Sequence, residues 1–480
     1  MRYLRVVLAF LMMLNLSGAV LAQSSSEEGV EMEWIRYEVE DAAQLVDLRL
    51  TQTTKGYSGR GYAVGFTNDT GSATFPVAVE EDGIYEVAIG YRAPHGEKYA
   101  VFLLNDEAIG NVCLPASQSF SQAHAGKVFL NKGINLLTIE KGWGWYELDY
   151  IALRRAETIK LPMVSAEPIN PNATPEARAL LQFLTDNFGK RIIAGQQEYN
   201  GSLMRDTTYI KRITGKEPAL LGLDLMDYSP SRVERGTKSQ DIEAAIEWHK
   251  RGGIVAFTWH WNAPKGLEAN GREWWSGFYT DATHFDVAAA LADPESEDYQ
   301  LILRDIDAIA LQLKRLQDEG VPVLWRPLHE AEGGWFWWGA KGAEPCKELW
   351  KLLYHRLTEH HQLNNLIWVW NSISPEWYPG DEYVDIVSCD IYTQPLSYGP
   401  SAAEFERLLQ LGERPKIVAM AENGGIPDPD AAQAYGAMWG WFMTWNGDIL
   451  RDWNDSEHLK NVYNHPLVIT LDELELRSIF

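Results

Sequence analysis

The second half of the chain alternates short apolar runs with longer amphipathic stretches. Ile302, Ile306, Ile309, Leu313 and Leu316 recur at steps of three and four residues, which is the period of a helix buried on one face, and Gly320 ends that pattern. Eight apolar runs are typical of buried strands: 192–198, 219–224, 254–261, 321–330, 367–371, 385–392, 416–422 and 439–445. Eight strands alternating with helices predict an α/β fold, a (β/α)8 TIM barrel. A doubly wound sheet is the alternative, but its glycine-rich phosphate loop is missing from this sequence.

Residues 33–156 follow a different pattern. Short alternating runs such as 85–91, 99–104 and 135–140 are separated by Gly and Asn turns, and no helical period connects them. Several short strands at this spacing predict a small β-sandwich of the jelly-roll type. Between the two patterns, residues 157–175 contain four prolines, which disfavour both helix and sheet. We therefore expect a sandwich at 33–156, a linker at 157–175 and a barrel at 176–480.

Two of the predicted barrel strands end in a carboxylate. Glu330 closes the run Val-Pro-Val-Leu-Trp-Arg-Pro-Leu-His-Glu, and Glu422 closes Lys-Ile-Val-Ala-Met-Ala-Glu. The carboxyl ends of barrel strands form one mouth, where active sites lie. Two carboxylates facing one site are the working parts of a glycosidase. The alternative is that both are ordinary strand-end acids in a chain with 67 acidic residues.

Composition favours carbohydrate as the ligand. The chain contains 20 Trp and 21 Tyr, and an exposed indole needs a flat, partly apolar partner such as the face of a sugar ring. A formal net charge of −25 argues against nucleic acid and anionic membranes, which require clustered Lys and Arg. A neutral polysaccharide is compatible with this charge.

The N-terminus has the order of a secretory signal peptide. A basic start is followed by an apolar run from Val6 to Leu14 and by small residues before Gln23, which predicts cleavage after Ala22 and removal of residues 1–22. We therefore expect an extracellular protein. The three cysteines, Cys113, Cys346 and Cys389, can form at most one disulfide, so the fold does not depend on a disulfide framework.

Polar and aromatic residues surround the two glutamates in the sequence. Arg326 would need a carboxylate partner if it pointed inward, and Arg326, His329 and Tyr392 are suited to separate the pKa values of an acid and a nucleophile. His329 could instead cap a strand end. The loop after Glu330 reads Gly-Gly-Trp-Phe-Trp-Trp-Gly, and we expect Trp335 to be its exposed indole.

The run Trp-Arg-Pro-Leu-His-Glu at 325–330, followed by that loop, resembles glycoside hydrolase family 26, whose main activity is endo-β-1,4-mannanase. The resemblance extends over most of residues 176–480. It implies that Glu330 is the general acid/base and that Glu422 is the nucleophile. It further implies a set of substrate-binding residues, namely His260, His329, Trp335, Asp385, Asp390, Tyr392 and Trp445. Ala331-Glu332 departs from the family pattern, which leaves the neighbouring subsite preferences open.

The N-terminal domain is similar to carbohydrate-binding module family 35 in its segments 37–42, 56–62 and 142–151. That similarity implies a structural calcium held by Glu38, Glu40 and Asp149, whose oxygens are of the type that calcium prefers. It makes Trp143 the expected sugar-stacking residue. The alternative is that Trp143 or Trp145 fills the sandwich core.

Together these observations predict a secreted retaining endo-β-1,4-mannanase that acts as a monomer on neutral β-mannan and needs no cofactor for catalysis. Two alternatives stay open. One is another β-glycan hydrolase of the same family, acting on mixed-linkage β-glucan or β-1,3-xylan. The other is a carbohydrate-binding protein without catalytic activity.

Overall fold

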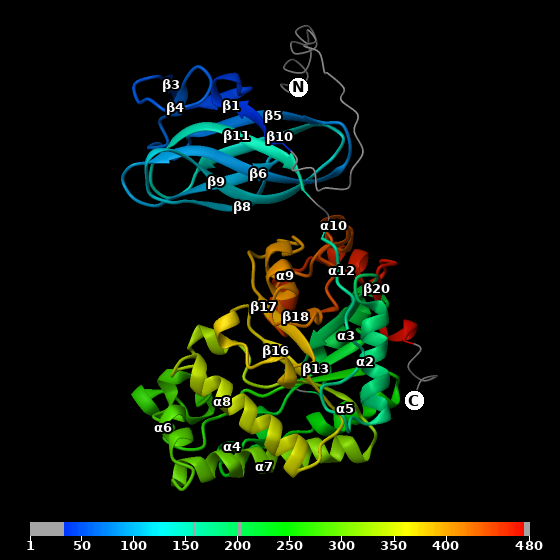
Figure 1. Cartoon of the computed structure of the whole chain (residues 1–480). Helices are drawn as coiled ribbons and strands as arrows, with labels where there is room; N and C mark the ends of the chain where they lie inside the picture. Colours follow the sequence, from blue (N-terminus) through cyan, green and yellow to red (C-terminus); the bar gives the residue numbers. More distant parts are fainter. Residues whose placement is uncertain (1–32, 157–158, 200, 202, 475–480) are drawn as a thin grey trace.

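The computed structural model of the chain describes residues 33–156, 159–199, 201 and 203–474 and consists of two domains (Figure 1). The expected signal peptide at 1–22 lies outside the described residues. Among the residues described, no helix is both long and apolar enough to cross a lipid bilayer. All three cysteines are free, Cys113 exposed and the other two buried.

The N-terminal domain is an antiparallel β-sandwich. One sheet has the strand order β3-β4-β11-β6-β9 with β1 paired to β11, and the other has the order β2-β5-β10-β7-β8. The strands are β1 (Ile35–Glu38), β2 (Gln44–Val46), β3 (Arg49–Thr51), β4 (Tyr62–Val64), β5 (Ser72–Val79), β6 (Gly83–Ala93), β7 (Lys98–Leu104), β8 (Glu107–Leu114), β9 (Ser117–Leu130), β10 (Gly133–Lys141) and β11 (Glu147–Arg155). Alternate apolar side chains of both sheets fill the space between them, so the predicted sandwich is confirmed.

The C-terminal domain is a closed parallel barrel. Its strands pair in the order β13-β14-β15-β16-β17-β18-β19-β12, and β12 pairs with β13 to close the ring, while β20 (Val468–Ile469) extends β12 outside it. The barrel strands are β12 (Ile192–Gln197), β13 (Leu220–Asp224), β14 (Ile254–Thr258), β15 (Val323–Arg326), β16 (Leu366–Asn371), β17 (Ile386–Ile391), β18 (Ile417–Asn423) and β19 (Trp441–Thr444). Each falls within or against one of the eight predicted runs, so the barrel is confirmed.

Helices cover the outside of the ring (Figure 1). They are α2 (Pro175–Asn187), α3 (Arg205–Thr214), α4 (Pro230–Val233), α5 (Asp241–Lys250), α6 (Val287–Ala292), α7 (Glu297–Asp318), α8 (Ala343–Tyr354), α9 (Ala402–Leu409), α10 (Pro429–Tyr435), α11 (Asp448–Trp453) and α12 (Ser456–Tyr463). Helix α7 buries the apolar stripe seen in the sequence, and the Ser296 hydroxyl caps it by accepting a hydrogen bond from the amide of Tyr299.

The sandwich rests on the helices that follow β17 and β18. The Lys127 ammonium on β9 pairs with Glu406 on α9, and the amide of Phe129 donates a 2.8 Å hydrogen bond to the Tyr435 hydroxyl on α10. In Figure 1 the sandwich accordingly lies above α9 and α10. The two domains are therefore in direct contact.

Parallel pairing brings the polar carboxyl ends of the strands to one edge of the barrel. Asp224, Thr258, Arg326 and Asn371 are the last residues of β13, β14, β15 and β16. The strands themselves are almost entirely buried. Their polar last residues therefore lie at the boundary between the apolar core and the carboxyl edge of the barrel, where active sites of this fold lie.

Candidate active site

Three carboxylates meet at the carboxyl end of the barrel. One oxygen each from Glu330, Asp390 and Glu422 can be chosen so that all three atoms lie within 4.8 Å of one another. Asp390 is the fifth residue of β17 and Glu422 the sixth of β18, and both are buried among the barrel strands. Three like charges this close cannot all be ionised without a compensating cation.

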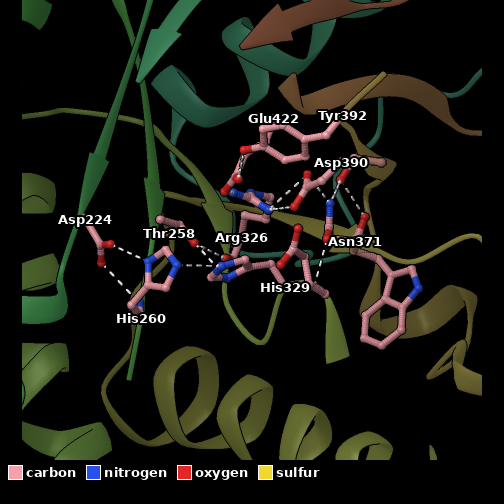
Figure 2. A network of polar contacts seen from close by, with 12 residues as sticks. Asp224, Thr258, His260, Arg326, His329, Asn371, Asp390, Tyr392 and Glu422 are labelled. Atoms are coloured by element: carbon pink, nitrogen blue, oxygen red, sulfur yellow. Dashed lines mark hydrogen bonds and ion pairs between the residues drawn. The ribbon is translucent and has the colours of Figure 1, made fainter. Parts of the chain in front are cut away.

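Arg326 supplies that cation. Its guanidinium donates to both oxygens of Asp390, at 2.9 and 3.2 Å, and also to one oxygen of Glu422 (Figure 2). The sequence-based expectation that an inward Arg326 needs a carboxylate partner is therefore met twice. Burial opposes the arginine charge, but Asp390 and Glu422 raise its pKa above the usual value.

A β-bulge places Asp390 directly beside Glu422. The register between β17 and β18 pairs Cys389 with Met420 but Asp390 with Glu422, so one residue of β18 is skipped. Bulges of this kind re-aim side chains near active sites. The sequence-based prediction assumed regular alternation along each strand and therefore did not include this bulge.

Glu330 reaches the site through a turn rather than along a strand. The sequence pattern predicts a strand over 321–330 with Arg326, Leu328 and Glu330 on one side, but β15 ends at Arg326. Leu328 and Glu330 both have φ of 53°, in the left-handed region that side chains disfavour by roughly 1–2 kcal/mol per residue. The amide of Glu330 donates a 2.9 Å hydrogen bond to Asn371 Oδ1, which secures the end of the turn.

Each glutamate has its own hydrogen-bond donor. The Tyr392 hydroxyl donates to Glu422 Oε2 at 2.9 Å, and the Trp335 indole N–H donates to Glu330 Oε2 at 2.9 Å. Tyr392 is 41% exposed and Trp335 49% exposed, so two accessible aromatic rings contact the glutamates, of which Glu422 is buried and Glu330 partly buried. Trp335 is the exposed indole of its loop, as expected, because Trp337 and Trp338 are fully buried.

Comparison with known proteins agrees with this geometry. The model of glycosyl hydrolase family 26 matches residues 169–473, and that of carbohydrate binding module family 35 matches residues 35–156. The chain belongs to glycosyl hydrolase family 26. It is 49% identical over 442 residues, 92% of this chain and 90% of the relative, to a mannan endo-1,4-beta-mannosidase of Thermothelomyces thermophilus. It is 34% identical over 92% of its length to mannan endo-1,4-beta-mannosidase A of a Piromyces species, covering 72% of that protein.

A solved structure has the same two domains. The crystal structure of the Podospora anserina GH26-CBM35 beta-(1,4)-mannanase matches 92% of this chain and 98% of its own, with 48% identity and a TM-score of 0.70. The protein is therefore a family 26 glycoside hydrolase with an N-terminal family 35 module.

In this family 26 hydrolase, the carboxylate cluster retains a proton near neutral pH. Burial, and then the charge of Asp390, raises the pKa of both glutamates, that of Glu330 to about 7 and that of Glu422 to about 8. Glu422 accepts from Arg326 and Tyr392, and both contacts stabilise its carboxylate form. A hydrogen bond between Glu330 and Asp390 stabilises protonated Glu330. These hydrogen bonds favour the carboxylate form of Glu422 and the protonated form of Glu330.

The two histidines of the expected site differ in how accessible they are. His260, half-buried, lies beside Trp445, with 6.0 Å between ring centroids, at the same end of the barrel. His329 is only 1% exposed and uses both ring nitrogens in hydrogen bonds to Thr258 and His260, so its imidazole faces protein rather than solvent.

Asp385 is not part of the cluster, which corrects the sequence-based assignment. It precedes β17 and therefore lies at the opposite end of that strand from Asp390. Its carboxylate accepts hydrogen bonds from the amides of Ile169 and Trp368, both at 2.8 Å. Asp385 thus connects the linker, through Ile169, with strand β16, through Trp368, by hydrogen bonds. Two residues that the sequence did not single out, Asp224 and Thr258, instead lie at the functional end.

In the family 35 module, Trp143 is 66% exposed and Trp145 is 41% exposed. The alternative that one of them fills the core is wrong. Tyr146 takes that place and stacks on Phe66 with ring centroids 4.3 Å apart. Trp143 therefore offers an accessible indole.

Glu38, Glu40 and Asp149 surround the loop at 58–60. The Ser58 hydroxyl donates to Glu38 at 2.6 Å, and the Ser58 amide donates to both oxygens of Asp149 at 2.9 and 3.1 Å. Burial raises the pKa of Asp149 to about 6, and the charges of Glu38 and Glu40 contribute. One buried oxygen of Glu40 has no hydrogen-bond partner among the residues that the structure describes. An unsatisfied oxygen and mutual repulsion are features that cation ligands share.

Replacing Asp390 by Asn tests the origin of the acid's pKa. The charge of Asp390 raises the pKa of Glu330, so Asp390→Asn should lower it. Activity of a general acid is lost as pH rises through its pKa, and the alkaline limb of the pH profile of kcat/KM should therefore move to lower pH. Asp318→Asn, on the exposed end of α7, should leave the limb in place. An alkaline limb unchanged in Asp390→Asn would contradict the assignment of the proton.

Replacing Asp385 by Ala separates a structural acid from a catalytic one. The change leaves the amides of Ile169 and Trp368 without their acceptor, which should cost about 1–3 kcal/mol per buried amide and lower the melting temperature. The kcat/KM of the folded variant should match the wild type. A variant with normal thermal stability and much reduced kcat/KM would place Asp385 back in the active site.

Proposed function

We propose that this protein is a secreted endo-β-1,4-mannanase that cleaves internal bonds of mannan by double displacement. The observation that carries the mechanism is the spacing of the two glutamates. Their nearest oxygens lie within 4.8 Å, which fits the separation of about 5–5.5 Å in retaining glycosidases. An inverting pair stands about 6.5–9.5 Å apart to admit a water.

The contacts of each glutamate give it one role. Glu422, ionised beside Arg326, attacks the anomeric carbon while Glu330 transfers its proton to the departing glycosidic oxygen. Glu330, now a carboxylate, removes a proton from a water molecule, and that water displaces Glu422 from the sugar. The Trp335 ring beside Glu330 offers a stacking surface for the leaving sugar.

Mannan is the proposed substrate because the relatives from Thermothelomyces thermophilus and Piromyces are named as mannan endo-1,4-beta-mannosidases. Reducing-sugar release on β-mannan, xylan and mixed-linkage β-glucan tests this choice. Greater release from mannan, as internal fragments of mixed length, supports it. Preference for another glycan would favour another specificity within the family, and no release from any of them would favour a binding protein.

Export is proposed from the N-terminal sequence alone. The mature protein would begin at Gln23, which N-terminal sequencing of protein from the culture medium can check. The module would hold the enzyme on its polysaccharide through Trp143, with a calcium ion bound by Glu38, Glu40 and Asp149 stabilising the fold.

Alanine variants of the two glutamates should differ in kinetics. Glu422→Ala removes the nucleophile, so every substrate should become inert. Glu330→Ala removes the acid/base, yet a dinitrophenyl β-mannoside needs little protonation and can still form the glycosyl-enzyme. This variant should release a burst of dinitrophenolate and then turn over slowly, and azide should accelerate the slow phase because it needs no base. Equal loss in both variants, with no burst and no azide rescue, would refute the assigned roles.

Calcium removal should destabilise only the module. Because the ion binds the folded state, excess chelator should lower the melting temperature of the module by several degrees while hydrolysis of soluble mannan hardly changes. In Asp149→Ala the chelator should have no further effect. A melting curve of the wild type that is the same with and without chelator would count against a bound calcium.

A further inference from the structure

The backbone that presents Glu330 is strained. Leu328 and Glu330 are both left-handed, with His329 between them, and β15 ends at Arg326, before this turn. Residues with side chains keep such conformations only where their surroundings impose them. Residues 328–330 must therefore be held by contacts from outside β15.

Asn371 holds one end of the turn through the Glu330 amide, and His329 supplies the other contacts. Its ring, 1% exposed, is joined by hydrogen bonds to the Thr258 hydroxyl at 3.0 Å through Nδ1 and to His260 Nε2 at 3.2 Å through Nε2. Its carbonyl oxygen accepts a 2.9 Å hydrogen bond from the Trp338 indole. The residue at the centre of the turn is thus fixed at three points.

The hydrogen bonds continue along the carboxyl edge of the barrel to β13. His260 Nδ1 lies 2.6 Å from Asp224 Oδ2, and the His260 amide donates to Asp224 Oδ1 at 3.1 Å. Figure 2 shows Asp224, His260, His329 and Thr258 together, next to the Arg326 cluster. We call these four residues the histidine chain. It connects the ends of three adjacent strands, β13, β14 and β15.

Charged groups surround the histidine chain on several sides. Arg326 faces His329, while Asp390 and Glu422 act on His260 through their charges. Arg232 of α4 and Asp241 of α5 interact in the same way with Asp224. Burial lowers the pKa of His329, so its ring is neutral and offers one donor and one acceptor. A threonine hydroxyl can form a hydrogen bond with His329 Nδ1 whether that nitrogen carries a proton or not, whereas a valine side chain can form none.

We propose that the histidine chain positions the acid/base: by anchoring His329 it maintains the left-handed turn 328–330 that carries the Glu330 carboxyl, and Asp224 and Thr258 are positioning residues for the reaction. This inference rests on the proposed role of Glu330. It assigns a task to two residues that do not themselves touch the substrate-facing carboxylates in the network of Figure 2.

Thr258→Val is the sharpest test, because it removes one hydroxyl at nearly constant volume. The other contact of that hydroxyl is a 3.3 Å hydrogen bond to the carbonyl oxygen of Arg326, where β15 ends and the turn begins. Asp224 is less suitable, since it also accepts from the amide of Met226. The readout is kcat/KM on two β-mannosides, one with dinitrophenol and one with an unactivated sugar as leaving group. Misplacing the acid should lower kcat/KM about 10-fold for the sugar leaving group and less than about 2-fold for dinitrophenol. The ratio of the two values does not depend on how much protein is folded.

Two variants serve as controls. Thr258→Ser keeps the hydroxyl and should restore the wild-type ratio. Thr358→Val makes the same change at a buried threonine whose hydroxyl has no hydrogen-bond partner among the described residues, and its ratio should equal that of the wild type.

The outcomes separate this inference from the proposed function. A changed ratio in Thr258→Val, restored in Thr258→Ser, supports the inference. An unchanged ratio in Thr258→Val overturns it, whether or not both rates fall together, provided that Glu330→Ala shows the leaving-group dependence. If Glu330→Ala itself shows none, Glu330 is not the acid, and the proposed function and the inference fail together.

Discussion

The ion pair network around Arg326 is the constraint on which the active site depends. One guanidinium, almost wholly buried, binds Asp390 and Glu422 at the same time. Breaking a buried pair by removing one partner costs about 3–5 kcal/mol, because a charge is left uncompensated. Asp390 therefore has two effects. It shares the arginine with Glu422, and its negative charge raises the pKa of both glutamates, so that the cluster keeps a proton, which the proposed mechanism assigns to Glu330.

Two departures from regular strand geometry bring the reacting groups together. The bulge between β17 and β18 sets Asp390 level with Glu422, and the left-handed turn after β15 carries Glu330 toward them. Regular parallel strands would leave these side chains on alternating faces. The barrel thus supplies the frame, and local distortions at its carboxyl edge set the separation of the two glutamates on which the proposed retaining mechanism rests.

Much of this architecture could be predicted from sequence. Buried parallel strands read as continuous apolar runs, so the eight strands and the two glutamates at the ends of their runs were visible without coordinates, although Glu330 follows β15 in a turn. The bulge was not visible, because nothing in Cys-Asp-Ile or Met-Ala-Glu signals a skipped residue. Asp385 was misplaced because the family resemblance was followed, although the predicted run 385–392 begins with this acid and so sets it at the amino end of the strand, where it accepts two amides. Asp224 and Thr258 were overlooked, although an acid that closes the run 219–224 is the same signal that identified Glu330.

The central claim is that Arg326 and Tyr392 keep Glu422 ionised as the nucleophile. Its most direct test is to trap the glycosyl-enzyme with a 2-deoxy-2-fluoro-mannoside that carries a good leaving group, and to locate the added mass by peptide mass spectrometry. The account predicts one modified peptide, with the sugar esterified to Glu422. A sugar attached to Glu330 or Asp390, or complete hydrolysis with inversion at the anomeric carbon and no labelled peptide, would contradict it.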